Sequence, residues 1–84
     1  MYSLYILRSK KDYNIYIGVS SNLKKRIEEH NSGKSFATSF RLPFELIYCE
    51  IYKDKRDAFN REKMLKYYGQ GLRRLKERLK YSLL

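Results

Sequence analysis

The sequence predicts an α+β fold in which a three-stranded antiparallel sheet is flanked by three helices. Three runs of aromatic, β-branched and leucine residues, at positions 2–8, 13–19 and 44–52, have the composition of strands. The segments after the second and third runs combine helix-capping side chains with apolar residues at helical spacing. A chain of 84 residues buries only one modest core. We therefore expect a single domain that spans residues 1–84.

The first two strands are expected to form a hairpin, because residues 9–12 between them are polar. A turn centred on Lys10 and Lys11 would place Tyr5 directly opposite Tyr16. Both phenols would then share one face of the sheet.

The third strand has one face that is more apolar than the other. Ile47, Cys49 and Ile51 form the apolar face, whereas Glu50 lies on the opposite one. Antiparallel sheets commonly pack their apolar face against the core. We therefore expect Ile47, Cys49 and Ile51 to face inward.

A first helix is expected at residues 23–30, because each residue of the Ser-Ser-Asn segment at 20–22 can cap a helix start. Arg26 and His30 lie four residues apart on this helix and form a polar row beside its apolar positions. Residues 34–42 follow as a loop that is long enough to touch a ligand.

Two further helices are expected in the last third of the chain. The earlier one begins with an N-cap at Asp54 or Asp57 and runs to about Tyr68, where the Gly-Gln-Gly segment at 69–71 interrupts it. The later one covers residues 72–81, with three leucines on one stripe: Leu72, Leu75 and Leu79.

The charge of the chain points to an anionic partner. It has 19 Lys and Arg against 9 Asp and Glu, a net charge of +10, and residues 63–84 hold seven basic side chains and one acid. Such a surface can also be a solvated helix face. Nine tyrosines interleaved with the basic residues favour nucleic acid over a membrane surface.

The single cysteine and single histidine exclude some classes of site. Cys49 cannot close an intramolecular disulfide, and one cysteine with one histidine cannot build a four-ligand zinc site. The apolar runs are too short to span a bilayer. A reducing, cytoplasmic location is expected.

Glu62 is the most informative single residue. It lies four residues after Ala58 and three before Leu65, so the helix face that buries those two also carries a carboxylate. An isolated inward carboxylate is costly. Two explanations are open: a salt bridge, for example to Arg26 or Lys66, or a bound cation.

Several of these residues together resemble a known family. The tripeptides at 3–5 (Ser-Leu-Tyr) and 16–18 (Tyr-Ile-Gly), Arg26 ten residues after Tyr16, His30 four residues later, and Glu62 on a later helix resemble the GIY-YIG nuclease superfamily. The order and spacing of the whole set make the match specific. The chain is similar to the small stand-alone members found in bacteria.

The resemblance implies hydrolysis of a phosphodiester with one divalent ion, Mg²⁺ or Mn²⁺. Glu62 matches the metal-binding glutamate, and Arg26 matches the arginine that contacts the scissile phosphate. Tyr5 matches the tyrosine expected to act as base, with Tyr16 orienting the attacking water. His30 lies where the family places a histidine or tyrosine, and its near-neutral pKa suits proton transfer.

The expected substrate is DNA rather than RNA, chosen by shape with weak sequence preference, as in DNA repair. A shallow basic cleft between one sheet face and the helix that bears Glu62 would hold it. The chain is expected to be a monomer or a weak homodimer, with no membrane partner. Contacts to the nucleic acid are expected from seven residues: Gly18, Lys34, Thr38, Arg61, Lys66, Arg73 and Arg74.

Two alternatives belong to other classes of protein. One is a catalytically idle module that keeps the fold and binds nucleic acid through its basic helices. The other is an interaction protein that docks a partner on the stripe of Leu72, Leu75 and Leu79.

Overall fold

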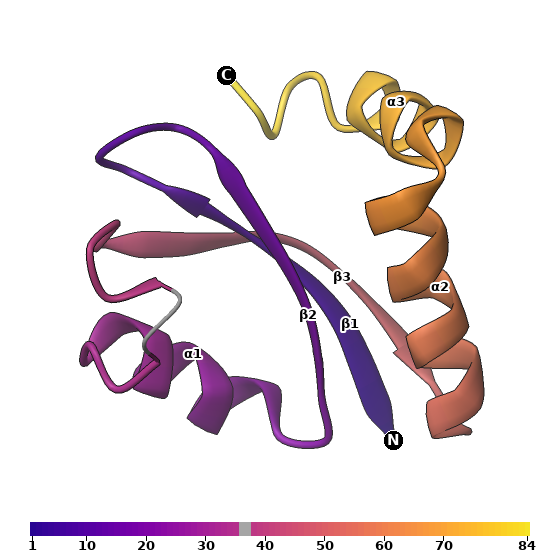
Figure 1. The fold of residues 1–84 in the computed structure, drawn as a ribbon, viewed down its shortest axis with the longest axis horizontal. Coiled ribbons are helices and arrows are strands. Elements are labelled where there is room, and N and C mark those ends of the chain that lie inside the picture. The colour runs from indigo at the N-terminus through magenta and orange to yellow at the C-terminus, as the bar shows by residue number, and fades with distance from the viewer. Residues whose placement is uncertain (36–37) are drawn as a thin grey trace.

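A computed structural model describes residues 1–35 and 38–84 and shows a three-stranded sheet as the centre of the molecule (Figure 1). The strands are β1 (Tyr2–Ser9), β2 (Ile15–Ser20) and β3 (Phe44–Tyr52), all antiparallel and arranged in the order β2-β1-β3. The predicted α+β fold is confirmed.

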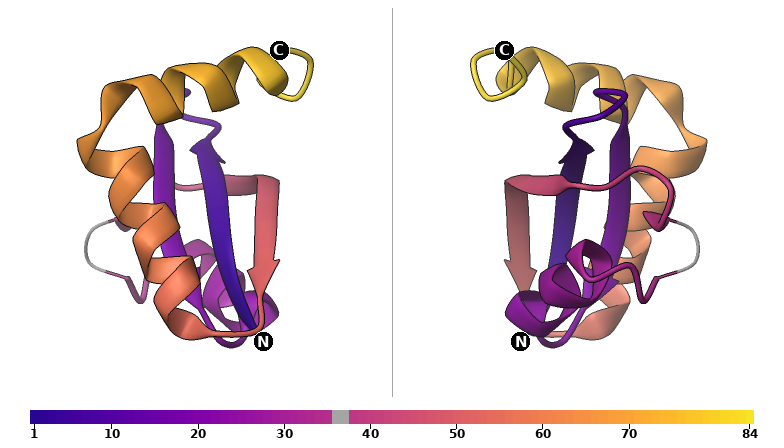
Figure 2. Two further views of the ribbon diagram at one scale, coloured as in Figure 1. Left: turned by 90° about the vertical axis from the view of Figure 1, so that its right-hand side faces the viewer. Right: turned by 90° about the vertical axis from the view of Figure 1, so that its left-hand side faces the viewer.

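Helices cover both faces of this sheet (Figures 1 and 2). Helix α1 (Leu23–Asn31) lies on one side, whereas α2 (Lys55–Tyr67) and α3 (Gly69–Arg78) lie on the other. At each helix start one of the candidate residues forms the N-cap: the Asn22 side chain accepts a hydrogen bond from the backbone N–H of Lys25, and the Asp54 side chain accepts one from the backbone N–H of Arg56. In the described parts of the chain, no helix is both long and apolar enough to cross a membrane.

The apolar core is split into two clusters by the sheet. On the α1 side, Tyr5, Leu7 and Phe44 are buried. On the other side, the sheet packs against α2 and α3, and the leucine stripe of α3 lies inside this second cluster: Leu4, Ile6, Ile17, Leu65 and Leu75 are buried, with Leu72 and Leu79 packed against them. A partner therefore cannot dock on that stripe, because the domain's own core covers it.

The register of the hairpin is shifted from the prediction, because the residue opposite Tyr5 is Gly18 rather than Tyr16. Tyr5 lies opposite Gly18, and Tyr16 lies opposite Leu7, so the turn centres on residues 11–12. The Ser9 hydroxyl shifts the turn, because it accepts hydrogen bonds from the backbone N–H groups of Lys11 and Asp12. Because side chains alternate between the two faces, this shift of two residues keeps Tyr5 and Tyr16 on the same face, as predicted.

The inward face of β3 differs from the prediction beyond Ile47, which packs against the core as predicted. A β-bulge where Ile6 and Leu7 pair with Tyr48 and Leu46 leaves Ile47 without a partner. Beyond the bulge, Cys49 and Ile51 are exposed. Glu50 lies on the α2 side instead, because its carboxylate accepts hydrogen bonds there from three groups: the hydroxyls of Tyr48 and Tyr52 and the guanidinium of Arg61.

The break between α2 and α3 is shorter than predicted. Tyr68 alone separates the helices, with φ −120° and ψ 93°. Gly69 and Gly71 lie inside the first turn of α3, which ends at Arg78 rather than near Tyr81. The glycines fit there because the first helical turn tolerates weak helix formers.

Candidate active site

Tyr5 is buried at the centre of β1, on the side of the sheet that α1 covers. Its side chain is 1% exposed, and Gly18 lies directly opposite on β2. A side chain at position 18 would overlap the Tyr5 hydroxyl and ring. Glycine at this position therefore makes the space for Tyr5. The expected contact of Gly18 with nucleic acid is corrected, because the Tyr5 ring already fills that space.

A line of hydrogen bonds runs from Tyr5 through His30 to Thr38. His30 is fully buried; its Nε2 lies 3.1 Å from the Tyr5 hydroxyl, and its Nδ1 lies 2.7 Å from Thr38 Oγ1. The Thr38 hydroxyl donates to the Ser35 carbonyl, at 3.4 Å, so it accepts the bond from Nδ1–H. We assign this tautomer from the set of partners. It leaves Nε2 as the acceptor of the Tyr5 proton.

Burial and a nearby charge set the pKa values of this pair. Burial lowers the pKa of His30 below its ordinary 6.5, and the positive charge of Arg26 lowers it further. Burial raises the pKa of Tyr5 above its ordinary 10.0, although a hydrogen bond with Arg26 opposes the rise. Near neutral pH, His30 is therefore mostly neutral and Tyr5 keeps its proton.

Arg26 and Tyr16 complete the group around Tyr5. The Arg26 side chain is 33% exposed and donates to Glu29 at 2.9 Å. Its pKa is raised, first by the hydrogen bond with Tyr5. The Tyr16 ring centroid lies 4.9 Å from that of His30 and 6.4 Å from that of Tyr5. Residues far apart in the sequence thus place two phenols, an imidazole and a guanidinium on one side of the sheet.

Glu62 approaches this group around β2, the edge strand. The expected cleft lies at the edge of the sheet, where a hollow of about 310 Å³ between β2 and α2 is lined by Tyr16, Leu65 and Lys66. Lys66 connects Glu62 with Tyr16, because its Nζ lies 3.3 Å from the Glu62 carboxylate and 6.0 Å from the Tyr16 ring centroid. The negative charge of Glu62 also acts on Tyr5, whose pKa it raises. The predicted salt bridge of Glu62 with Lys66 is confirmed.

The donor set fits a divalent cation held by one carboxylate. Within residues 1–35 and 38–84, no group of three or more His, Cys, Asp or Glu side chains could hold a metal ion. The Glu62 side chain is 22% exposed, and its one ion pair, with Lys66, leaves it further lone pairs. Mg²⁺ commonly binds one or two carboxylates and keeps waters and substrate phosphates as its other ligands.

Two more residues expected to contact nucleic acid have other roles. Thr38 is fully buried and bonds His30, so it has no surface for a phosphate. The guanidinium of Arg61, on α2, lies 3.0 Å from the Glu50 carboxylate of β3 and forms an ion pair with it. The remaining residues expected to contact nucleic acid lie at exposed positions: Lys34, Lys66, Arg73 and Arg74.

The hydrogen bond between Thr38 and His30 was not predicted from the sequence. Thr38 stands in a loop without periodicity, so no pattern relates its hydroxyl to a helix eight residues earlier. The role of Gly18 could have been found, because a glycine inside a strand often marks a close approach by another group.

Comparison with known proteins shows the family of the chain. The sequence pattern of the GIY-YIG catalytic domain matches residues 1–70. A UPF0213 protein of Clostridium perfringens is 42% identical over 64 residues, which are 75% of this chain and 68% of that protein. A UPF0213 protein of Staphylococcus haemolyticus is 36% identical over 78 residues, 89% of this chain and 94% of that one.

A solved structure is similar as well. The solution NMR structure of a UPF0213 protein from Bacillus halodurans matches with a TM-score of 0.55 and 34% sequence identity, over 94% of this chain and 82% of that chain. GIY-YIG nucleases generally use divalent metal ions. On the family match and these relatives, the chain belongs to the GIY-YIG family, whose catalytic domain is of the nuclease type.

Proposed function

We propose that this protein is a metal-dependent endonuclease that hydrolyses phosphodiester bonds in DNA. The observation that carries the proposal is the hydrogen bond between Tyr5 and His30, with the positive charge of Arg26 acting on both residues. A nuclease must remove a proton from water and stabilise negative charge on a phosphate. The paired Tyr5 and His30 provide for the first task, and Arg26 for the second.

Proton transfer is assigned to Tyr5 and His30 acting together. A phenol with a raised pKa is a poor base by itself. His30 removes this difficulty, since its Nε2 accepts the Tyr5 proton as the Tyr5 oxygen takes one from water. Thr38 holds the imidazole in the tautomer that the transfer needs. Tyr16 orients the water from the other side of His30.

Arg26 is assigned to the scissile phosphate. Its guanidinium is planar, permanently charged and partly open to solvent, which suits two-point contact with phosphate oxygens. The contact strengthens as negative charge grows in the transition state. A lysine at this position would lack the forked geometry and would be a poor substitute.

Glu62 is assigned to a divalent ion, Mg²⁺ or Mn²⁺, which when bound supplies positive charge at the phosphate. When no ion is bound, the Lys66 ammonium pairs with the Glu62 carboxylate. Once an ion is bound, the Lys66 ammonium can turn to a phosphate of the substrate, since its side chain is 40% exposed.

The substrate is proposed to be DNA, recognised by shape more than by sequence. A net charge of +10 favours contact with the phosphate backbone, which carries no sequence information.

The test is cleavage of branched, flapped and single-stranded DNA in Mg²⁺ or Mn²⁺ by the wild type and two variants, Glu62→Ala and Arg26→Ala. Both variants should lose cleavage, whereas Lys53→Ala, at an exposed site beyond β3, should cleave like the wild type. Cleavage that neither variant alters would disprove the assignment of this site. Binding without cleavage in any metal would favour the idle nucleic-acid-binding module.

A further inference from the structure

Lys66 holds the carboxylate that the proposed function assigns to a divalent ion. Its Nζ lies 3.3 Å from Glu62 Oε2, and the two residues are one helical turn apart on α2. In the described part of the chain, neither residue forms an ion pair with any other side chain. A cation that approaches Glu62 therefore meets the Lys66 ammonium at the same carboxylate.

A divalent ion and the Lys66 ammonium would compete for this carboxylate. The lone pairs of Glu62 let an ion approach, but two cations on one carboxylate lie well within a Debye length of about 8–10 Å and repel each other. An ion pair between partly exposed side chains four residues apart on a helix is weak. The ion, which carries twice the charge of the ammonium, should therefore displace Lys66 rather than be excluded by it.

The displaced side chain has room beside Tyr16. Lys66 lines the hollow of about 310 Å³ together with Tyr16 and Leu65, and its Nζ lies 6.0 Å from the centroid of the Tyr16 ring. The face of an aromatic ring attracts an ammonium at about this distance. Because the lysine stem is flexible, the charge can move from Glu62 toward Tyr16 while α2 and β2 stay in place.

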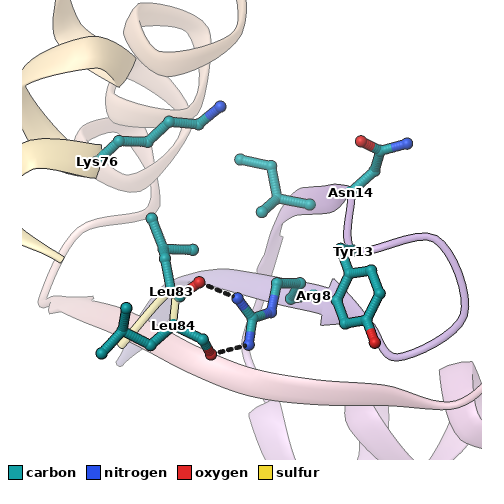
Figure 3. Close-up of a pocket in the computed structure, with 7 residues that line it drawn as sticks. Arg8, Tyr13, Asn14, Lys76, Leu83 and Leu84 are labelled. Carbon is teal, nitrogen blue, oxygen red and sulfur yellow. Dashed lines mark hydrogen bonds between the residues drawn. The ribbon is translucent and has the colours of Figure 1, made fainter. Parts of the chain in front are cut away.

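A second hollow, of about 480 Å³ between the hairpin turn and the end of the chain, lacks this arrangement (Figure 3). Arg8 donates there to the main-chain carbonyls of Leu83 and Leu84. Lys76 also lines this hollow, but no Asp or Glu does so among the described residues. Lys66 differs from Lys76 because its partner is a carboxylate that can bind a metal ion.

From these contacts we propose that Lys66 is a placeholder for the divalent ion: it pairs with Glu62 until the ion binds and then moves toward Tyr16. The inference rests on the proposed function and adds a control over metal affinity at the same site. Lys66 lowers the affinity of Glu62 for the ion. In return, a DNA phosphate that arrives before the ion meets a paired carboxylate instead of a free negative charge.

Binding of Mn²⁺ to the protein without DNA tests this competition independently of cleavage. Electron paramagnetic resonance of the free ion would measure the affinity at low salt. Lys66→Met keeps a long side chain but removes the charge, and it should bind Mn²⁺ about 10-fold more tightly than the wild type. Lys66→Arg keeps the charge and should bind like the wild type. The matched controls Lys63→Met and Lys76→Met remove the same charge where no carboxylate is paired, and they should change the affinity at most about 2-fold.

The ion pair itself can be followed in the wild type by NMR of the lysine side chains. Addition of Mg²⁺ should shift the Nζ resonance of Lys66 as its contact with Glu62 breaks. The resonance of Lys63, which forms no ion pair within residues 1–35 and 38–84, should move less. In Glu62→Ala, Lys66 has lost its partner already, so Mg²⁺ should leave its resonance unchanged.

The outcomes separate this inference from the proposed function. Tighter Mn²⁺ binding by Lys66→Met that is lost when Glu62→Ala is added supports the placeholder even if the protein cuts no DNA. Equal Mn²⁺ affinities of the wild type and Lys66→Met overturn the placeholder, although binding and cleavage that depend on Glu62 would leave the proposed function standing. Mn²⁺ binding that Glu62→Ala does not weaken, or no binding by any of these proteins, overturns both.

Discussion

In the proposed mechanism, Tyr5 and His30 work as one unit because each lacks what the other supplies. Burial makes the Tyr5 phenol reluctant to ionise and keeps the imidazole of His30 neutral. A bond of 3.1 Å between them gives the phenolic proton a destination. The role of base is therefore proposed for the residue pair rather than for either residue alone.

The pH dependence of His30 provides a residue-scale prediction. Because its folded pKa lies below the unfolded value near 6.5, its contribution to stability is complete above pH 6.5 and is lost as the pH falls toward the folded pKa. The free energy of unfolding should decrease there by at most about 1.4 kcal/mol per pH unit. NMR titration can follow His30 directly, as it is the single histidine. A measured pKa at or above 6.5 would contradict its burial beside Arg26.

Gly18 gives a second residue-scale prediction. Gly18→Ala introduces a Cβ that overlaps the Tyr5 hydroxyl, so the ring must move away from His30. We expect a loss of about 1–3 kcal/mol in the free energy of unfolding and a larger proportional loss of cleavage. Gly69→Ala is the matched control, because a Cβ at that position meets nothing within 4 Å. Denaturant unfolding and cleavage rates check both variants; equal effects would refute the close packing of Tyr5 on Gly18.

At the scale of elements, α2 is fixed to the sheet by a polar contact as well as by leucines. Glu50 of β3 is half-buried and accepts bonds from Tyr48, Tyr52 and Arg61. Burial and the bond to Glu50 raise the pKa of Tyr52 to about 12. Since α2 also carries Glu62 and Lys66, this contact determines where those two side chains lie.

Breaking the contact should therefore loosen α2. Glu50→Ala leaves Arg61 and two hydroxyls without their partner, and we expect the free energy of unfolding to fall by about 2–3 kcal/mol. Removing the exposed pair of Arg56 with Asp54 through Arg56→Ala should change stability little. Chemical denaturation distinguishes the two. An unchanged midpoint for Glu50→Ala would show that apolar packing alone holds α2.

Element types were predictable from the sequence, whereas several details of how they meet were not. Strand composition and caps at Asn22 and Asp54 located the sheet and the helices, since these signals are local. The hairpin register depended on one hydroxyl, at Ser9, and the inward face of β3 on a bulge. Both are contacts between segments, which hydrophobic patterns do not encode.

The same distinction holds for the candidate site. The resemblance to the GIY-YIG family, carried in part by the spacing of Tyr16, Arg26 and His30, indicated which residues gather. The sequence could not show that Thr38 lies beside His30 or that Arg61 is partly buried, since each of these contacts depends on a partner from another element.

At the scale of the whole molecule, charge dominates the expected behaviour. A net charge of +10 on 84 residues makes nucleic-acid binding depend steeply on ionic strength. If about four phosphates are contacted, affinity should fall about 100-fold between 50 and 200 mM salt. Titrations at several salt concentrations measure this slope. An affinity independent of salt would contradict binding through the phosphate backbone.

The claim that Tyr5 lies at a catalytic centre is tested most directly by the single-turnover rate of flap cleavage in Mg²⁺ by Tyr5→Phe. This variant keeps the ring against Gly18 and removes only the hydroxyl that bonds His30. We predict a rate at least about 100-fold below the wild type with unchanged DNA affinity. A wild-type rate for Tyr5→Phe would contradict it.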